Sequence, residues 1–371
     1  MDVGTFAAEF EAWLDTHPEV VAPVVAPIAD YDERVVAMRR FMSELFDAGW
    51  NRYGWPEHLG GLGGSILHRA AMWEALARRG IAGMAVFEHF EVLAPTLAAL
   101  GPAEFVSEAL PDFLAGRHVW SQGFSEPNSG SDLASLRTTA RATDGGYLVN
   151  GSKIWTSWSK YATWCLVLTR TGTAESRHRG LPALIVDLRE SGVEVRPITQ
   201  ANGTDELAEV FFDDAFVPLD RVVGELDGGW AVAMHILSHE RGTYAWFRHA
   251  FLYQYLLDGM EFATEANDAA IGNALLDLAA VSSAGFSGVQ AHATGAPLGA
   301  LAAYPKILLC NAEQSVCDAT LAFDADLVLD VADDAVALRR QEYLFSRIVT
   351  VYGGSQQMQL DTIAKQILPS R

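Results

Sequence analysis

The chain has 371 residues, half of them apolar, with a mean hydropathy close to zero. That length is enough for two or three domains with a large core. The formal net charge of −21 at pH 7 argues against nucleic acid or an anionic membrane surface as a partner. Three cysteines suggest a reducing compartment and no disulfide framework, so a cytoplasmic protein is predicted.

Neither a secretory signal nor a membrane span is predicted. The first residues, from Met1 to Thr5, lack a basic segment followed by an apolar one. The most apolar stretch, residues 80–100, is interrupted by Glu88, His89 and Glu91. An anionic ligand would have to be held by local donors, such as helix N-termini or single basic side chains.

Residues 1–116 are predicted to form an N-terminal helical domain. Apolar residues recur at i, i+3 and i+4 between Val35 and Phe46. The segment from Ala70 to Arg79 is rich in strong helix formers. The glycines and proline of residues 54–64 predict a loop between these helices.

Residues 117–225 are predicted to form a middle β-domain, because the apolar period changes to two. Residues 147–155 follow a Gly145-Gly146 turn and have the pattern of a hairpin. Turn residues such as Gly192 and Asp213-Asp214 separate the segments and favour a small barrel or sandwich. Further strands are predicted at residues 164–169, 181–188, 193–198 and 209–212.

Residues 226–371 return to helical patterns and are predicted to form a four-helix bundle. The fold class is therefore α+β and multidomain, in the order helical, β, helical. The predicted bundle helices are residues 230–255, 268–293, 298–327 and 334–351.

Two sequence motifs in the middle region lie at a characteristic distance from each other. Residues 122–132 read Gln-Gly-Phe-Ser-Glu-Pro-Asn-Ser-Gly-Ser-Asp, and residues 150–157 read Asn-Gly-Ser-Lys-Ile-Trp-Thr-Ser. A third segment, residues 352–359, reads Tyr-Gly-Gly-Ser-Gln-Gln-Met-Gln. With their order along nearly the whole chain, these motifs resemble those of the acyl-CoA dehydrogenase family, which has the same three-domain fold.

The resemblance implies a bound FAD whose isoalloxazine ring meets the first two motifs. An isoalloxazine needs hydrogen-bonding groups along its pyrimidine edge and a flat apolar cover on one face. In relatives, Trp155 matches the indole on the face away from substrate, Ser157 a hydroxyl near flavin N5, and Ser131 a contact to the pyrophosphate. Turn chemistry alone would also explain such residues, but two motifs in register favour the flavin. The remaining predicted cofactor contacts are Gln122, Phe124, Ser125 and Gln357.

The resemblance also implies a carboxylate that removes a proton from the substrate Cα. In many relatives this glutamate follows the tyrosine of the C-terminal motif, where the chain has Gly353. Isovaleryl-type and long-chain members carry the base in a Glu-Arg pair on a bundle helix, which Glu240 and Arg241 match. Glu240 is therefore the predicted base. Adjacent helix positions diverge by about 100°, so Arg241 is expected to brace the loop containing Gly353.

Gly353 is the third predicted catalytic element. In relatives, the backbone N–H of this residue and a ribityl hydroxyl of FAD hold the thioester carbonyl. A glycine keeps its N–H, so Gly353 is expected to stabilise the developing enolate charge.

The chain departs from the family in the residues expected to hold the FAD of a neighbouring subunit. No arginine occurs between His249 and Leu338, Lys306 is the only lysine there, and the usual Gly-rich segment is missing. Two interpretations are open: a homotetramer or homodimer with altered cofactor contacts, slightly favoured, or a heterotetramer whose paralogous partner supplies them, as in bacterial dehydrogenases for steroid side-chain CoA esters.

Several other residues have less distinctive patterns. Residues 87–91 align with the helix that lines the acyl chain in relatives, and Tyr244, Trp246 and Phe247 could shorten the acyl pocket or, more simply, fill the core. His235 and His239 share a helix face without a third ligand, so no metal is predicted. Cys310 and Cys317 have the spacing of core residues.

The predicted function is dehydrogenation of an acyl-CoA to the trans-2-enoyl-CoA in fatty acid or lipid metabolism, with electrons passed to an electron-transfer flavoprotein. Three alternatives are kept: a catalytic subunit that requires a paralogous partner, an acyl-CoA oxidase or flavin monooxygenase, and a non-catalytic member such as a structural or DNA-associated protein. The net charge argues against DNA binding, and Glu240 argues against an inert subunit.

Overall fold

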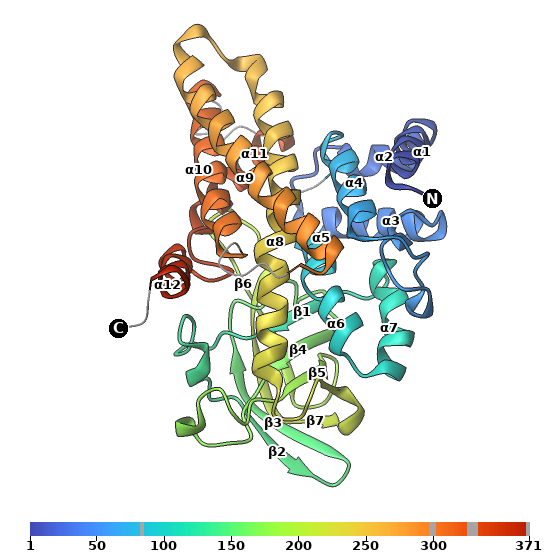
Figure 1. The fold of residues 1–371 in the computed structure, drawn as a ribbon, viewed down its shortest axis with the longest axis vertical. Coiled ribbons are helices and arrows are strands. Elements are labelled where there is room, and N and C mark those ends of the chain that lie inside the picture. Colours follow the sequence, from blue (N-terminus) through green and yellow to red (C-terminus); the bar gives the residue numbers. More distant parts are fainter. Residues whose placement is uncertain (82–84, 297–301, 325–332, 369–371) are drawn as a thin grey trace. The chain divides into compact units, whose positions relative to one another are not determined.

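The computed structural model describes residues 1–81, 85–296, 302–324 and 333–368, except for the side chains of residues 85–88, 174 and 240–243 (Figure 1). The chain forms two compact units. The first unit is Met1–Glu57, Gly61–Met84 and Glu240–Arg371; the second is His58–Gly60 and Ala85–His239. The division into domains at residues 116 and 225 stays a prediction.

The N-terminal part of the first unit is helical, as the sequence predicted, and four helices are described there. Side chains cap the first and third helices: Asp2 Oδ1 accepts from the Thr5 N–H, and Asp30 Oδ1 from the Glu33 N–H. The second helix has no side-chain cap and begins with Pro18. Ser65 caps the fourth helix together with His68 in a capping box. The helices are α1 (Val3–Thr16), α2 (Pro18–Val25), α3 (Tyr31–Asp47) and α4 (Ile66–Ala77).

The C-terminal part of the first unit is helical. It consists of the later part of α8 (Gly229–Gly259), α9 (Asp268–Thr294), α10 (Tyr304–Phe323), α11 (Asp334–Phe345) and α12 (Gln356–Ile367). Asn267, just before α9, donates to the carbonyl of Ala322 near the end of α10, so these helices run in opposite directions (Figure 1). Gly285 of α9 lies against the backbone of Trp246 in α8, where an added Cβ would be 3.2 Å from the Trp246 N.

Two of the predicted bundle helices have different ends in the structure. The helix predicted at residues 298–327 begins at Tyr304, where Pro305 occupies the first turn; residues 298–301 and 325–327 lie outside the described part. The helix predicted to reach residue 351 ends at Phe345 and continues as a 3₁₀ turn over Ser346–Ile348. The chain then enters the C-terminal motif.

The segment Glu265–Thr294, which includes α9, is long and apolar enough to cross a membrane by length and composition alone. The sequence prediction missed this segment. In the structure one face of α9 contributes Ala274, Leu278 and Val281 to a core shared with α8 and α10. A single helix of this kind is weak evidence for a membrane span, because bundle helices meet the same criteria.

The second unit combines short helices with two four-stranded sheets. Its helices are α5 (Ala85–Val92), α6 (Ala94–Leu100), α7 (Ala103–Leu114) and the beginning of α8. One sheet has the strand order β1-β4-β5-β8 and the other β2-β3-β7-β6. The strands are β1 (Trp120–Gly123), β2 (Thr139–Thr143), β3 (Gly146–Lys153), β4 (Trp164–Leu168), β5 (Ala183–Asp187), β6 (Val193–Ile198), β7 (Leu207–Pro218) and β8 (Val222–Val223).

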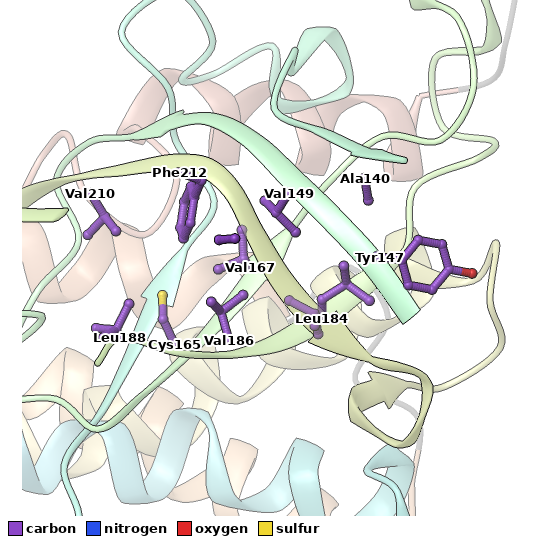
Figure 2. Close-up of a cluster of buried hydrophobic side chains, with 12 residues drawn as sticks. Ala140, Tyr147, Val149, Cys165, Val167, Leu184, Val186, Leu188, Val210 and Phe212 are labelled. Atoms are coloured by element: carbon purple, nitrogen blue, oxygen red, sulfur yellow. The ribbon is translucent and has the colours of Figure 1, made fainter. Parts of the chain in front are cut away.

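The core of the β-region contains alternating side chains from both sheets. Val149 and Phe212 come from one sheet, and Val167 and Leu184 from the other (Figure 2). All four are nearly inaccessible to water. In the β2-β3-β7-β6 sheet, burial alternates along β7 with the period of two that the sequence pattern predicted. In the other sheet, consecutive residues of β4 and β5 are buried, so that sheet is covered on both faces. The helical, β, helical order of the predicted fold is confirmed.

Strand β7 is longer than predicted. Asp213 and Asp214 were expected to end a strand at residue 212, but β7 continues to Pro218. Its pairing with β3 shifts register opposite Asn150, and Asp214 has a φ of 49°. The Asn150 amide donates to Asp214 Oδ1 at 2.8 Å, and the Asp214 N–H donates back at 3.0 Å. The two acidic residues therefore form a bulge within the strand rather than a turn.

Short 3₁₀ turns link these elements. They are η1 (Trp50–Arg52), η2 (Glu57–Leu59), η3 (Leu133–Ser135), η4 (Ala174–Ser176), η5 (Leu219–Arg221), η6 (Met260–Phe262), η7 (Glu265–Asn267) and η10 (Ser346–Ile348).

Candidate active site

The first two motifs are joined by their backbones in the second unit. The first motif begins in the last residues of β1, and the second begins within β3 and continues beyond its end. The Ile154 N–H donates to the Ser125 carbonyl at 2.9 Å. Phe124 is buried, while Gln122 and Ser125 are half-buried. The bond fixes the peptide plane of Ser125, so this segment has a defined orientation toward a ligand.

A buried ion pair lies beneath this junction. Lys153 Nζ is 2.8 Å from Glu126 Oε1 and donates to the Phe124 carbonyl at 3.1 Å. Glu126 also accepts hydrogen bonds from the N–H groups of Arg137 and Thr138, at 2.6 and 2.8 Å. The Lys153 side chain is completely buried. One lysine and one glutamate thus connect the two motifs and fix the peptide that carries Phe124.

Burial and charge pairing act against each other on the two side chains of this pair. Burial lowers the pKa of Lys153 to about 8, although the neighbouring Glu126 carboxylate opposes this shift. Burial alone would raise the pKa of Glu126, but the charge and hydrogen bonds of Lys153 outweigh it, and the pKa lies below its ordinary value. Both side chains are therefore ionised at neutral pH, although the pKa of Lys153 lies only slightly above it.

The loop after Glu126 presents Ser131 to solvent. Ser131 and Asp132 are exposed at its tip, and Asp132 forms an ion pair with Arg177 at 2.9 Å. Arg170, which is 4% exposed, donates to the carbonyls of Ala134 and Leu136. The buried Arg170 thus anchors the backbone that follows the loop, and the Ser131 hydroxyl at its tip remains accessible.

Trp155 is the most unusual residue of the second motif. Its indole is 56% exposed, although large aromatic side chains are normally buried. Its backbone has a φ of 61°, a left-handed conformation that costs a bulky residue about 1–3 kcal/mol. Strain of this size persists only where surrounding contacts hold it, and it is common at ligand sites.

The contacts that hold Trp155 come from the start of β7. The Thr156 N–H and hydroxyl both donate to the Ala208 carbonyl, at 3.0 and 2.8 Å. The Trp158 N–H donates to the Glu206 carbonyl at 2.7 Å. Trp158 is also left-handed, with a φ of 70°, but its side chain is fully buried. The buried tryptophan anchors the segment, and the exposed one extends from it, with half-buried Ser157 between them.

The second unit therefore offers the features that a flavin ring requires. An exposed, rigidly held indole provides a flat apolar surface, and the fixed peptide at Phe124 and Ser125 provides hydrogen-bonding groups. Ser157 and Ser131 add accessible hydroxyl groups. These residues fit the isoalloxazine and phosphate contacts expected of them, and their roles stay predictions.

The C-terminal motif lies in the first unit. Gly353 and Gly354 have φ values of 64° and 84°, which favour glycine at both positions. The buried Gln359 amide donates to the carbonyls of both glycines, each at 3.3 Å. Ser355 caps α12 by accepting from the Met358 N–H, and Gln357 is exposed in the first turn of that helix. The peptide of Gly353 is thus held in a left-handed turn.

The predicted base lies outside the part of the structure that describes side chains. The backbone at Glu240 and Arg241 is helical within α8, and their side-chain positions are not described. The assignments of Glu240 as base and Arg241 as brace therefore stay predictions.

The sequence interpretation missed a cluster of buried charges in the bundle. Arg248 on α8 pairs with Glu313 on α10 at 3.0 Å and also contacts Glu342 on α11. Burial raises the pKa of Glu313, although Arg248 opposes this shift. Lys306 is only 3% exposed, and its Nζ lies 3.6 Å from the centre of the Tyr352 ring. An arginine within an otherwise apolar helical stretch was the signal in the sequence.

The other singled-out residues behave as core residues. Tyr244 and Phe247 are buried, and Trp246 packs against the ring of Phe286. Cys310 and Cys317 are buried free thiols, and burial raises both pKa values. Within the described residues, no group of three histidine, cysteine or acidic side chains could hold a metal ion.

Profiles of known families match two parts of the chain. Residues 7–117 match the acyl-CoA dehydrogenase N-terminal domain, and residues 121–215 match the acyl-CoA dehydrogenase middle domain. The acyl-CoA dehydrogenase IpdE1 of Mycobacterium tuberculosis is 36% identical over 340 residues, covering 89% of this chain and 87% of that protein.

Solved structures show the same fold. The Tcur3481-Tcur3483 steroid ACAD superposes with a TM-score of 0.83 at 23% identity, covering all of both chains. The ChsE4-ChsE5 complex from Mycobacterium tuberculosis gives 0.80 at 24% identity, covering 99% of this chain and 98% of that one.

The family profiles and the relative of similar length agree with the motifs from which the resemblance was drawn. The predictions of a flavin-type oxidoreductase fold and of an enzyme are confirmed at the level of the family. The chain belongs to the acyl-CoA dehydrogenase family.

Proposed function

We propose that this protein is an FAD-dependent dehydrogenase that oxidises an acyl-CoA thioester to its trans-2-enoyl-CoA. The observation that carries the proposal is the exposed indole of Trp155, held in a strained conformation next to the peptide of Phe124 and Ser125. Such a surface suits a flat aromatic cofactor. Family membership supports the reaction class.

The chain supplies three actions to this reaction. Glu240 takes the proton from Cα, and the N–H of Gly353 donates to the thioester oxygen as negative charge develops there. Trp155 would cover one face of the cofactor. A bound FAD would supply the acceptor for the hydride that leaves Cβ. Holding base and oxyanion donor in fixed positions lowers the barrier to proton removal.

We propose an electron-transfer flavoprotein as the electron acceptor. An oxidase or monooxygenase of the same fold would instead consume O2 during turnover. Oxygen consumption of at least about one equivalent per enoyl-CoA formed would contradict a dehydrogenase.

A heteromeric enzyme is a second candidate, and the position of Lys306 favours it. This lysine is the only basic Lys or Arg between His249 and Leu338, and its side chain is buried against Tyr352. It is therefore unsuited to an exposed diphosphate. Structural neighbours of the chain include the ChsE4-ChsE5 complex and the Tcur3481-Tcur3483 enzyme. A paralogous subunit that supplies the missing cations would complete such a site.

The first experiment measures the flavin content of the purified chain. About one FAD per chain would support a self-sufficient homo-oligomer. A colourless protein that takes up FAD only with a co-expressed paralogue would support the heteromer. A chain that takes up no flavin under either condition would contradict the proposed function.

The second experiment tests the base in whichever assembly binds FAD. Glu240→Gln should abolish reduction of the flavin by a set of acyl-CoA thioesters, while FAD binding remains. Glu261→Gln, at an exposed position just after α8, is the matched control and should react like the wild type. Equal rates in the wild type and Glu240→Gln would exclude Glu240 as the base.

A further inference from the structure

The residue before Gly353 is tied to the helix of the predicted base. The hydroxyl groups of Tyr352 and Tyr244 are 3.0 Å apart. Their rings meet edge to face, with centroids 6.4 Å apart and planes at 69°. Tyr244 is only 3% exposed. Tyr352 is half-buried, so this hydrogen bond is partly shielded from water, and an unpaired hydroxyl would be costly there.

Tyr244 stands one helical turn beyond Glu240. Residues four apart on an α-helix lie on the same face, one above the other. The bond between the two tyrosines thus joins the turn of α8 that follows Glu240 to the peptide that precedes Gly353. The proposed reaction needs Glu240 and the N–H of Gly353 at a fixed distance from each other. The contact between Tyr244 and Tyr352 connects the two segments that carry them.

Lys306 fixes Tyr352 from a third element. Its Nζ lies 3.6 Å from the centre of the Tyr352 ring, and the side chain is 3% exposed. A cation over an aromatic face is attracted most strongly where water is excluded. Phe345 packs against the same tyrosine, with ring centroids 5.8 Å apart. The Tyr352 ring is consequently held by α8, by α10 and by the end of α11.

Buried charges one turn further along α8 support this arrangement. Arg248, four residues after Tyr244, pairs with Glu313 and contacts Glu342. The two carboxylates balance the two buried cations, Arg248 and Lys306. Because separating these charges would leave them unpaired in the interior, a shift of α8 against α10 or α11 would be costly.

The other side of Gly353 is held separately. Gln359 donates to the carbonyls of Gly353 and Gly354 and is itself fully buried. The turn is therefore fixed after Gly353 by an amide and before it by Tyr352. Among the described side chains, Tyr352 links the turn to α8, the helix of Glu240, through its hydroxyl contact with Tyr244.

We propose that Tyr244, Tyr352 and Lys306 are positioning residues that hold the N–H of Gly353 in register with Glu240. This inference rests on the proposed function for its catalytic meaning, since neither tyrosine hydroxyl is assigned contact with substrate. Simple core packing would depend on the rings alone. Positioning depends on the hydroxyl–hydroxyl bond and on the cation.

The test compares Tyr244→Phe, Tyr352→Phe and the double variant, which keep both rings but lose one hydrogen bond. Each single variant should lower kcat by about 5- to 10-fold, the worth of one buried hydrogen bond, with KM changed by less than about twofold. The double variant should be no slower than the slower single variant, because the same bond is lost in all three. Losses that multiply would contradict a shared bond.

Tyr255→Phe is the matched control. Tyr255 lies on the same helix and donates its hydroxyl to the Arg339 carbonyl at 3.2 Å. It should lose a similar amount of stability and keep the wild-type kcat. If Tyr244→Phe and Tyr352→Phe behave like this control, the tyrosines only fill the core.

Lys306 is tested by rescue. Lys306→Met should reduce kcat, and Lys306→Arg, which keeps a cation over the ring, should restore at least half of the loss on a logarithmic scale. If methionine supports the wild-type rate, the cation has no positioning role.

Amide hydrogen exchange of the whole protein provides a readout that needs no turnover. In the peptide covering residues 350–360, Tyr244→Phe and Tyr352→Phe should exchange about 5- to 10-fold faster than Tyr255→Phe. Unchanged exchange would overturn the positioning role even in an active enzyme. Faster exchange in a protein that oxidises no acyl-CoA would refute the proposed function and leave the structural link between α8 and the turn intact.

Discussion

Lys153 and Glu126 bring the two flavin motifs together through one completely buried cation. They are 27 residues apart in the chain. Lys153 also donates to the Phe124 carbonyl of the first motif, and Glu126 accepts from the N–H groups of Arg137 and Thr138, which follow that motif. The charges stabilise each other only as a pair, because either one alone would be an uncompensated ion in the core.

Breaking this pair should cost more than replacing it. Lys153→Met should lower the free energy of unfolding by about 3–5 kcal/mol, because it leaves Glu126 buried without its partner. The double variant Lys153→Met/Glu126→Gln should recover part of that loss. Urea unfolding of the three proteins measures the difference, and a double variant no more stable than the single would argue against an ion pair.

The stability contribution of Lys153 should also depend on pH. The pKa of Lys153 is about 8 in the folded protein and near 10.5 when unfolded, so between these values the unfolded chain binds more protons. Between these pH values, the free energy of unfolding of the wild type therefore rises with pH relative to that of Lys153→Met. This gain in stability is lost as the pH falls through 8. A difference between the two proteins that stays flat from pH 7 to 10.5 would contradict the lowered pKa.

The sequence predicted the residue types of the site better than their partners. Ser125, Trp155 and Gly353 follow from motifs that are local in the chain. The pairing of Lys153 with Glu126, or of Tyr244 with Tyr352, depends on contacts between segments distant in sequence. No sequence periodicity encodes such contacts. The four residues lie in the motifs or close to the predicted base, but the sequence did not indicate which residue each of them pairs with.

The segment from Trp155 to Trp158 stores backbone strain at two tryptophans. Both have positive φ, yet one side chain is 56% exposed and the other is fully buried. The same unfavourable backbone conformation therefore occurs once with an exposed side chain and once with a buried one. Substituting each tryptophan separates the effect of backbone strain from the effect of side-chain burial.

Glycine at these two positions should have opposite effects on stability. Trp155→Gly should leave the free energy of unfolding unchanged or raise it by up to about 1 kcal/mol, because it relieves strain and removes little buried area. It should also weaken FAD binding. Trp158→Gly, the control, should lose about 3–5 kcal/mol through the cavity that it creates. Thermal unfolding and FAD titration test both, and a strong destabilisation by Trp155→Gly would show that its indole is structural.

At the level of elements, the pattern predicted strands and helices well and their ends less well. The two aspartates at residues 213 and 214 are typical turn residues, yet Asn150 on the paired strand accommodates them as a bulge. The apolar pattern predicted a helix from residue 298, but α10 begins at Tyr304, where Pro305 occupies the first turn. Such ends are decided by a paired strand or a local backbone restriction.

The whole molecule carries a net charge of −21, because 47 acidic residues outnumber 26 lysines and arginines. Raising the NaCl concentration from about 20 to 300 mM shortens the Debye length several-fold and screens this repulsion. The melting temperature at pH 7.5 should therefore increase with salt. At pH 5, close to the sequence pI of about 4.8, the increase should largely vanish. An equal salt effect at both pH values would point to salting-out rather than to charge.

At the same scale, the order of helical, β and helical regions was predictable, and the composition of the compact units was not. The first unit combines Met1–Glu57 with Glu240–Arg371, segments separated by most of the middle of the chain. The Arg34 guanidinium, for example, donates to Gln341 across 307 residues. Local patterns contain no information about such distant contacts.

The burial of two lysines has a practical consequence for amine chemistry. The chain contains only four lysines, and Lys153 and Lys306 are withdrawn from solvent. Apart from the amino terminus, an amine-reactive reagent can therefore modify only Lys160 and Lys365 readily in the folded protein. These two belong to different compact units. Cross-linkers of different known lengths would therefore measure the distance between Lys160 and Lys365, and with it the spacing of the two units with and without bound cofactor.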